Sequence, residues 1–220
     1  MAKPGQSTRR MARQRRLKAF LSFGLALFMI IQGDSILRSL LKSDSQAWMI
    51  SITISGVSIL GGNRFWKRAD QAAQGARAEE MVGATLNQLR AYAWTIEHDI
   101  PVPRWGNVDH LAISPSGKYF CIDTKSGKGT IVLKGHELSK QYGRTIYPFP
   151  KGKSILKAVK GQAGQLQKSR AATWVKPVLC FVGSQVEKSI LNTQVQGVLL
   201  TDVHSIASIL QSMSVHQSLS

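Results

Sequence analysis

Apolar residues divide the chain into an N-terminal part with two uncharged runs and a longer part in which helical and strand periods alternate. The first uncharged run covers residues 19–32 and the second covers residues 47–62. Each run is shorter than the roughly 20 residues that cross the apolar core of a bilayer. Neither run has the polar face that a helix of a soluble domain turns to water. The pattern therefore predicts two apolar helices before residue 63.

Basic residues flank these two runs and favour a membrane hairpin. Seven Lys and Arg residues precede the first run without any acidic residue, and Arg64, Lys67 and Arg68 follow the second run. Because basic residues concentrate on the cytoplasmic side of membrane spans, we expect both termini and the rest of the chain in the cytoplasm, with the lipid bilayer as a partner. A signal peptide, or two buried helices of a soluble domain, are the alternative interpretations.

The remaining pattern predicts an α/β fold. A helical apolar period covers residues 68–94, and Pro101 and Pro103 then favour an extended or loop segment. Further strands and helices follow: strands at 107–113, 118–124 and 130–133, a Pro/Gly-rich loop through Gly152, a helix at 154–174, strands at 177–182 and 197–200, and a helix at 203–213. Short turns make the first three strands antiparallel, whereas a helical crossover allows the next strand to return parallel. The expected fold is a mixed sheet flanked by helices, in the order αβββαβ.

These patterns give a division of the chain into parts. We expect a basic cytoplasmic tail at 1–18, a transmembrane two-helix hairpin at 19–62 and a linker at 63–74. A folded domain at 75–213 and a short tail at 214–220 complete the chain.

The charge of the chain indicates an anionic partner. The formal net charge is +17, and residues 71–220 alone hold 17 Lys and Arg against 9 Asp and Glu, a net charge of +8. No acidic residue lies between Glu137 and Glu187. A field of one sign suits nucleic acid, DNA or RNA, or an anionic membrane surface. The basic side chains expected to contact nucleic-acid phosphates are Lys151, Lys153, Lys157, Lys160, Lys168 and Arg170.

Two strand-like runs carry the residues with the clearest chemistry. Asp109 lies in the first run, and Asp123 and Lys125 lie in the next one. Side chains two positions apart on a strand share a face, so Asp123 and Lys125 point the same way, and the neighbouring strand brings Asp109 beside them. Two carboxylates and a lysine in otherwise apolar strands favour a divalent-metal site. Ion pairs at a sheet edge are the structural alternative.

The stretches at 78–82, 98–101 and 106–110, with Asp123-Thr124-Lys125, resemble the NERD family, the nuclease-related domain, over roughly residues 75–205. The resemblance implies a restriction-endonuclease-like core and a PD-(D/E)xK type of active site. Its expected catalytic residues are Glu79, Asp109, Asp123 and Lys125, with a helical glutamine at Gln162 or Gln165. The implied cofactor is Mg²⁺ or Mn²⁺, held by Glu79, Asp109 and Asp123. The implied reaction is metal-dependent hydrolysis of DNA or RNA phosphodiesters.

Other chemistries find less support in the sequence. Cys121 and Cys180 lie in apolar runs without metal-ligand spacing and are expected to be buried thiols. The five histidines show no zinc-binding spacing. The segment 127–130 lacks the spacing of a phosphate-binding loop, so an ATP-driven role has no support. The alternative to a nuclease is a membrane-anchored module of the same fold that binds nucleic acid or protein without cutting. A purely structural membrane protein is a further alternative. The sequence does not indicate an oligomeric state.

Overall fold

The computed structural model describes residues 2–41, 43–149 and 154–215, arranged as two compact units. Residues Ser7–Gln74 form the hairpin unit, and Met1–Gln6 with Gly75–Ser220 form the α/β unit. Their boundary falls inside one continuous helix, because residues 63–74, expected as a linker, lie within a helix that runs from Asp44 to Asn87. Of the expected tail, residues 216–220 lie outside the described residues.

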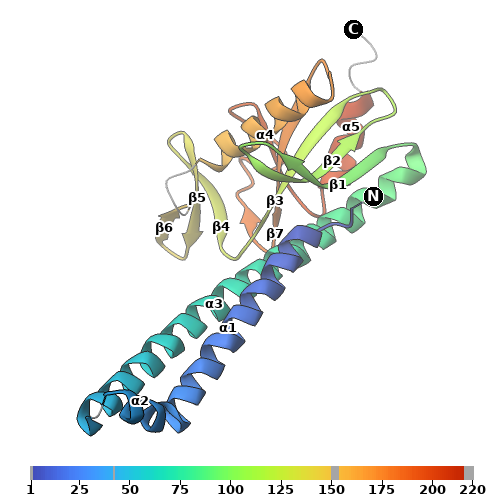
Figure 1. Ribbon diagram of the computed structural model, residues 1–220. Helices are drawn as coiled ribbons and strands as arrows, with labels where there is room; N and C mark the ends of the chain where they lie inside the picture. Colours follow the sequence, from blue (N-terminus) through green and yellow to red (C-terminus); the bar gives the residue numbers. More distant parts are fainter. Residues whose placement is uncertain (1, 42, 150–153, 216–220) are drawn as a thin grey trace. The chain divides into compact units, whose positions relative to one another are not determined.

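The hairpin unit contains three helical segments (Figure 1). They are α1 (Gln6–Ile31), α2 (Gly33–Leu41) and the first part of α3 (Asp44–Asn87). Helices α1 and α3 pack side by side: the Ser55 hydroxyl donates to the Ala26 carbonyl at 3.3 Å, and the Phe20 and Trp66 rings meet edge to face at 5.5 Å. Among the described residues, no single helix has both the length and the apolar character to cross a membrane; α1 and α2 meet both conditions only together, and they bend by 64° where they join.

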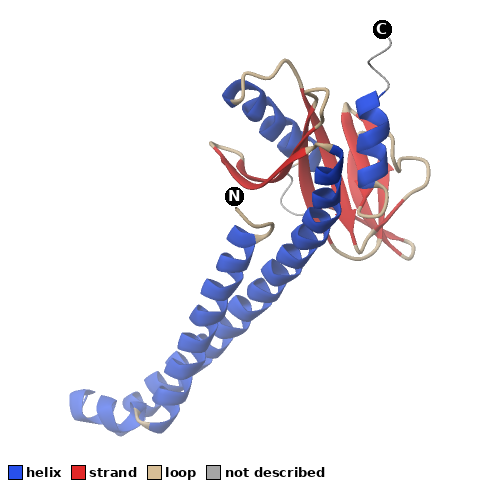
Figure 2. Ribbon diagram, turned by 90° about the vertical axis from the view of Figure 1, so that its right-hand side faces the viewer, coloured by secondary structure: helices blue, strands red, loops and turns tan. Residues whose placement is uncertain are grey.

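Two sheets form the centre of the α/β unit, and helices pack against them (Figures 1 and 2). The six-stranded sheet has the order β1-β2-β3-β7-β10-β9, and the four-stranded sheet has the order β6-β5-β4-β8. The strands are β1 (Thr95–Val102), β2 (Gly106–Ile113), β3 (Tyr119–Ser126), β4 (Thr130–Lys134), β5 (Glu137–Tyr142), β6 (Thr145–Pro148), β7 (Val175–Val182), β8 (Gln185–Val186), β9 (Gln194–Val195) and β10 (Val198–Asp202). The helices of this unit are the last turns of α3, η1 (Gln88–Tyr92), α4 (Ile155–Ser169) and α5 (Ile206–Val215).

The predicted mixed α/β fold is confirmed, with one change in which strands form the main sheet. Strands β1, β2 and β3 pair antiparallel, and β3, β7 and β10 pair parallel. The segment at 130–133, expected as the third strand of this sheet, is β4 of the smaller sheet. Its place is taken by β1, which the prolines had suggested to be an extended or loop segment. Pro101 is compatible with β1 because this strand lies at the edge of the sheet, where a missing N–H is tolerated.

Apolar side chains cover both faces of the six-stranded sheet. On one face, Leu111, Leu179 and Phe181 pack beneath α4. On the other face, Ile122 and Val178 pack beneath α5 and the last turns of α3. Figure 2 shows α4 and α5 on opposite sides of the sheet. Alternation along β3 explains this sorting, because odd-numbered residues such as Cys121 face α4 and even-numbered residues such as Ile122 face α3 and α5.

Leu111→Ala tests the core beneath α4. Leu111 is fully buried, so the substitution is expected to lower the free energy of unfolding by about 2–5 kcal/mol through lost contacts and a residual cavity. Leu133 in β4 is 38% exposed, and Leu133→Ala is the matched control with an expected change below about 1 kcal/mol. Urea unfolding followed by tryptophan fluorescence measures both. Equal losses for the two variants would contradict this arrangement of the core.

Candidate active site

The candidate site lies where strands β2 and β3 separate. Their last recorded pair is His110 opposite Ile122, and one further step along the same register sets Asp109 opposite Asp123. Beyond this step β3 pairs only with β7, as far as Ser126 opposite Val182. The backbone N–H of Thr124 donates to Asp109 Oδ2 at 2.7 Å. A side-chain carboxylate thus takes the hydrogen bond that a strand carbonyl would otherwise accept, and two acidic side chains meet at the opening.

Lys125 accompanies this pair of carboxylates. Lys125 Nζ and Asp123 Oδ2 form an ion pair, as their shared face of β3 predicts. Asp123 is 7% exposed, whereas the Lys125 side chain is 31% exposed. The Lys125 side chain is therefore partly exposed, whereas the carboxylate that it pairs with is buried.

Three carboxylates, those of Asp109, Asp123 and Glu79, lie near one another in the protein interior and determine the electrostatics of the site. Burial raises the pKa of Asp109 well above its usual range, and the charges of Asp123 and Glu79 raise it further, against the opposing effects of Lys125 and the Thr124 N–H. Burial alone would lower the pKa of Lys125, but the three carboxylates outweigh it and the pKa is raised. Lys125 is therefore charged at neutral pH. Ionisation of Asp109 is unfavourable unless a cation lies near it.

Glu79 reaches this cluster from another element. It lies on the last turns of α3, within the α/β unit, and is 8% exposed. Its charge acts on both Asp109 and Lys125. The structure thus brings four of the five predicted catalytic residues into one electrostatic neighbourhood.

Gln162, the fifth predicted residue, holds the start of β2 rather than the carboxylates. Its Nε2 donates to the carbonyl oxygens of Asn107 at 3.0 Å and Trp105 at 3.4 Å. Its Oε1 is buried and has no hydrogen-bond partner among the described residues. Because Asn107 is two residues from Asp109, this glutamine fixes the strand that carries the carboxylate.

A buried histidine pair supports the same strand from the opposite face of the sheet. Asn87 Oδ1 accepts from Arg90 Nε at 2.9 Å, so the His98 Nε2 that lies 3.2 Å from this oxygen is a donor. His98 Nδ1 must then accept from His110 Nδ1, 2.8 Å away. Burial, and then His98, lower the pKa of His110 to about 3. The pair is neutral and joins β1 and β2 to the end of α3, next to Asp109.

The donor atoms suit a hard divalent cation. No group of three His, Cys, Asp or Glu side chains within the described ranges is gathered closely enough to be a complete metal site. The facing carboxylates of Asp109 and Asp123 nevertheless offer oxygen ligands of the kind that Mg²⁺ and Mn²⁺ take. A cation there would also relieve the repulsion that raises the pKa of Asp109. The residues present therefore fit such an ion by charge and donor type.

Three of the predicted nucleic-acid-binding lysines lie on α4. Lys157, Lys160 and Lys168 are exposed, at helical positions that share one side of α4. Arg170, at the end of the helix, instead pairs with Glu97 at 2.5 Å. Lys151 and Lys153 lie outside the described residues. The exposed face of α4 is thus basic over its described length.

One cation near Lys125 was missing from the residues expected at the site. Lys140 in β5 has a pKa lowered by burial and then by the charge of Lys125. The sequence analysis places Lys140 only among the basic residues between Glu137 and Glu187, because residues 137–142 are expected to lie in a loop. The signal for a strand in the sequence is the spacing of Leu138 and Lys140, because residues two positions apart share one face of a strand.

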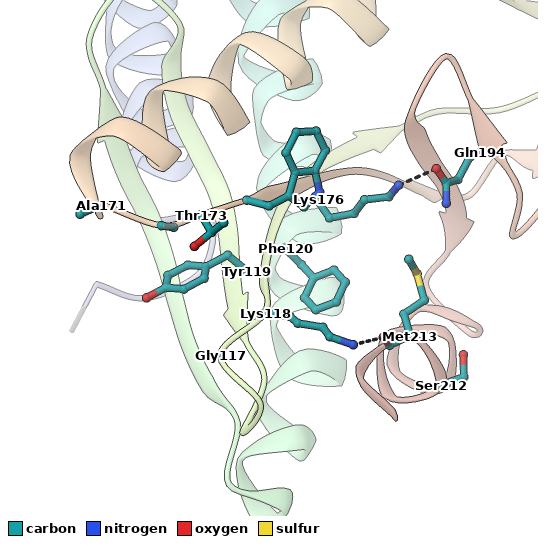
Figure 3. Close-up of a pocket in the computed structure, with 12 residues that line it drawn as sticks. Gly117, Lys118, Tyr119, Phe120, Ala171, Thr173, Lys176, Gln194, Ser212 and Met213 are labelled. Carbon is teal, nitrogen blue, oxygen red and sulfur yellow. Dashed lines mark hydrogen bonds between the residues drawn. The ribbon is translucent and has the colours of Figure 1, made fainter. Parts of the chain in front are cut away.

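Two hollows of the α/β unit lie away from Asp109 and Asp123. One, of about 640 Å³, is lined by residues at the starts of β3 and β7, with Lys118 and Lys176 directed toward Met213 and Gln194 (Figure 3). Asp123 and Lys125 lie further along β3 and do not line it. A second, of about 670 Å³, is lined by residues after β7 and after β10. Neither of these two hollows is lined by Asp109, Asp123 or Lys125.

Asp109→Asn tests the electrostatics of the site. The raised pKa means that the folded state holds a proton that the unfolded state releases above about pH 4, so the free energy of unfolding falls as pH rises through this window. The asparagine variant should lose this slope and gain about 0.5–2 kcal/mol at neutral pH. Urea unfolding at several pH values measures it, with exposed Glu137→Gln as the control. If the free energy of unfolding depends on pH in the same way in both proteins, the pKa of Asp109 is not raised.

Comparison with known proteins identifies one family for this part of the chain. The family model for the nuclease-related domain, NERD, matches residues 74–182. No curated protein and no solved structure gave a match. The matched range includes Glu79, Asp109, Asp123, Lys125 and Gln162. Through residues 74–182 the chain therefore belongs to the NERD family, the family of the nuclease-related domain.

Proposed function

We propose that this protein is a membrane-anchored nuclease that hydrolyses phosphodiester bonds of DNA or RNA with the help of a divalent metal ion. The observation that carries the proposal is the meeting of Asp109 and Asp123 at the separation of β2 and β3, with Lys125 paired to Asp123. The order of helices and strands around the six-stranded sheet is also that expected for a restriction-endonuclease-like core.

Each residue of the site has a distinct role in this proposal. Asp109 and Asp123, with Glu79 beside them, would hold Mg²⁺ or Mn²⁺, which polarises the phosphate and lowers the cost of making hydroxide. Lys125 is charged and partly exposed, so its ammonium can donate to the attacking water or to a phosphate oxygen. Thr124, through its N–H, keeps the Asp109 carboxylate turned to the site.

Nucleic acid is the substrate class that fits the surroundings. The exposed lysines of α4 offer contacts to backbone phosphates, and such contacts carry no base specificity. Gln162 joins this basic helix to β2 and so sets the lysines in a fixed relation to Asp109. We therefore propose cleavage without a strong sequence preference.

The distribution of side chains in the hairpin unit supports the membrane anchor. Its buried positions are almost all small, whereas its large apolar side chains point outward. The buried set is Ala12, Ala19, Ala26, Met29, Gly33, Ala47, Ser51, Ser55, Gly62, Ala69 and Ala72. The exposed set includes Leu21, Leu25, Phe28, Ile30, Trp48, Met49, Ile52 and Leu60. Helix pairs in water bury Leu and Ile, while helix pairs in lipid pack through small residues. We therefore propose that residues 19–62 enter the bilayer and leave the α/β unit in the cytoplasm.

A binding module without catalysis is the second candidate function. Lys125 is already paired with Asp123, and within the described ranges no three metal-binding side chains are gathered together. A protein of this fold that grips nucleic acid through α4 would need neither Asp109 nor Lys125.

Cleavage assays separate the two functions. With Mg²⁺ or Mn²⁺, the purified full-length protein is expected to cut labelled DNA or RNA, and Asp109→Ala and Lys125→Ala are each expected to lower the rate by about 100-fold or more. Lys134→Ala removes the same charge from an exposed position of β4 and should keep the rate. No cleavage with either metal, together with salt-sensitive binding by all four proteins, would favour the binding module.

Membrane attachment has a separate test. The full-length protein should stay with membranes after alkaline extraction, and a reporter fused to its C-terminus should be active in the cytoplasm. Replacing Leu25 and Ile52, both outward-facing, with lysines should release the protein or destabilise it, because charged side chains at the centre of a bilayer cost about 3 kcal/mol each. A reporter active outside the cytoplasm would overturn the proposed topology.

A further inference from the structure

Lys140 points inward from the smaller sheet. It lies two residues after Leu138, which is 3% exposed and belongs to the core beneath α4, so both side chains share one face of β5. Its cross-strand partner in β4 is Ile131, a fully buried member of the same core. A lysine on the inner face of a strand costs free energy unless its ammonium meets a suitable partner.

The Lys140 ammonium reaches the loop that follows Lys125. It occupies the space where a side chain on Gly127 would begin. It also lies 5.3 Å from the centre of the Phe149 ring. No acidic side chain of the described residues pairs with it, and no acidic residue lies in the sequence between Glu137 and Glu187.

A hydroxyl group faces the same point. Ser184 Oγ lies 3.4 Å from the position that a Cβ on Gly127 would take, and it is buried without a hydrogen-bond partner in the described part of the chain. The two loops that carry these groups are held together by backbone bonds, from Gly127 N to the Val182 carbonyl at 3.1 Å and from Gln185 N to the Gly129 carbonyl at 3.0 Å. Gly127 and Ser184 are therefore held close to each other.

We propose that Lys140, Ser184 and Lys125 form a phosphate site that holds a backbone phosphate of the nucleic-acid strand beside the candidate active site. The two ammonium groups can only donate, and the Ser184 hydroxyl can donate as well, which matches the acceptor oxygens of a phosphodiester. Burial, and then the charge of Lys125, lower the pKa of Lys140, and an anion bound beside both ammonium groups would offset these two effects. The phosphate site and the carboxylates share Lys125, which favours binding of a phosphate from the strand that is cut. The phosphate site therefore rests on the proposed function.

Binding measurements test the site independently of cleavage. Short fluorescent DNA and RNA strands would be titrated with the full-length protein, with Ca²⁺ in place of Mg²⁺, at several salt concentrations. Lys140→Gln is expected to weaken binding about tenfold and to reduce the slope of log K against log salt by about 0.7–0.9, the value of one lost phosphate contact. Lys134→Gln, an equal loss of charge at an exposed position in β4, should weaken binding less than about threefold.

Gly127→Ala provides a variant with unchanged net charge. Its methyl group would displace the Lys140 ammonium, so binding should fall as it does in Lys140→Gln. Thermal unfolding of Lys140→Gln and of the unaltered protein is measured as well. Removing one of two repelling cations should leave the melting temperature of Lys140→Gln unchanged or raised.

Three results would overturn the phosphate site. They are equal effects of Lys140→Gln and Lys134→Gln, a lowered melting temperature of Lys140→Gln with unchanged affinity, and absence of binding by the unaltered protein. Failure of the unaltered protein to cleave with Mg²⁺, while Lys140→Gln still weakens binding selectively, would remove the proposed nuclease activity and leave the phosphate site standing.

Discussion

The meeting of Asp109 and Asp123 is the interaction on which the rest of the site depends. Two carboxylates in a buried place repel each other, and the pKa of Asp109 is raised by burial and by this repulsion. The protein offsets part of the cost with the Thr124 N–H and with Lys125. The negative charge that remains attracts a cation. The arrangement that costs folding free energy therefore also prepares the site for a metal ion.

The fold keeps this strained junction in place from several directions. The histidine pair joins β1 and β2 to the end of α3, and Gln162 joins the start of β2 to α4. Parallel pairing with β7 holds β3 after β2 has left it. Because these supports come from both faces of the sheet, Asp109 and Asp123 cannot move apart without disturbing buried contacts.

Sequence patterns were sufficient for the elements whose side chains follow a clear period. The strands that carry Asp109, Asp123 and Lys125 were predicted within two residues of their bounds, and the buried state of Cys121 and Cys180 followed from their apolar neighbours. Strand β1 was missed because Pro101 suggests a loop, although an edge strand tolerates proline. Strands β5 and β6 were missed because polar residues and glycines surround short apolar positions. Lys140 was missed with them, since its neighbour Lys125 is close only after the chain folds.

Proton release on metal binding tests the central claim most directly. Calorimetric titration of the full-length protein with Mn²⁺, in buffers of different ionisation enthalpy near neutral pH, reports how many protons leave as the ion binds. The account predicts saturable binding with release of protons, because a cation lowers the raised pKa of Asp109, and no such release in Asp109→Asn. Absence of saturable binding, or equal proton release by both proteins, would contradict a metal site built on Asp109 and Asp123.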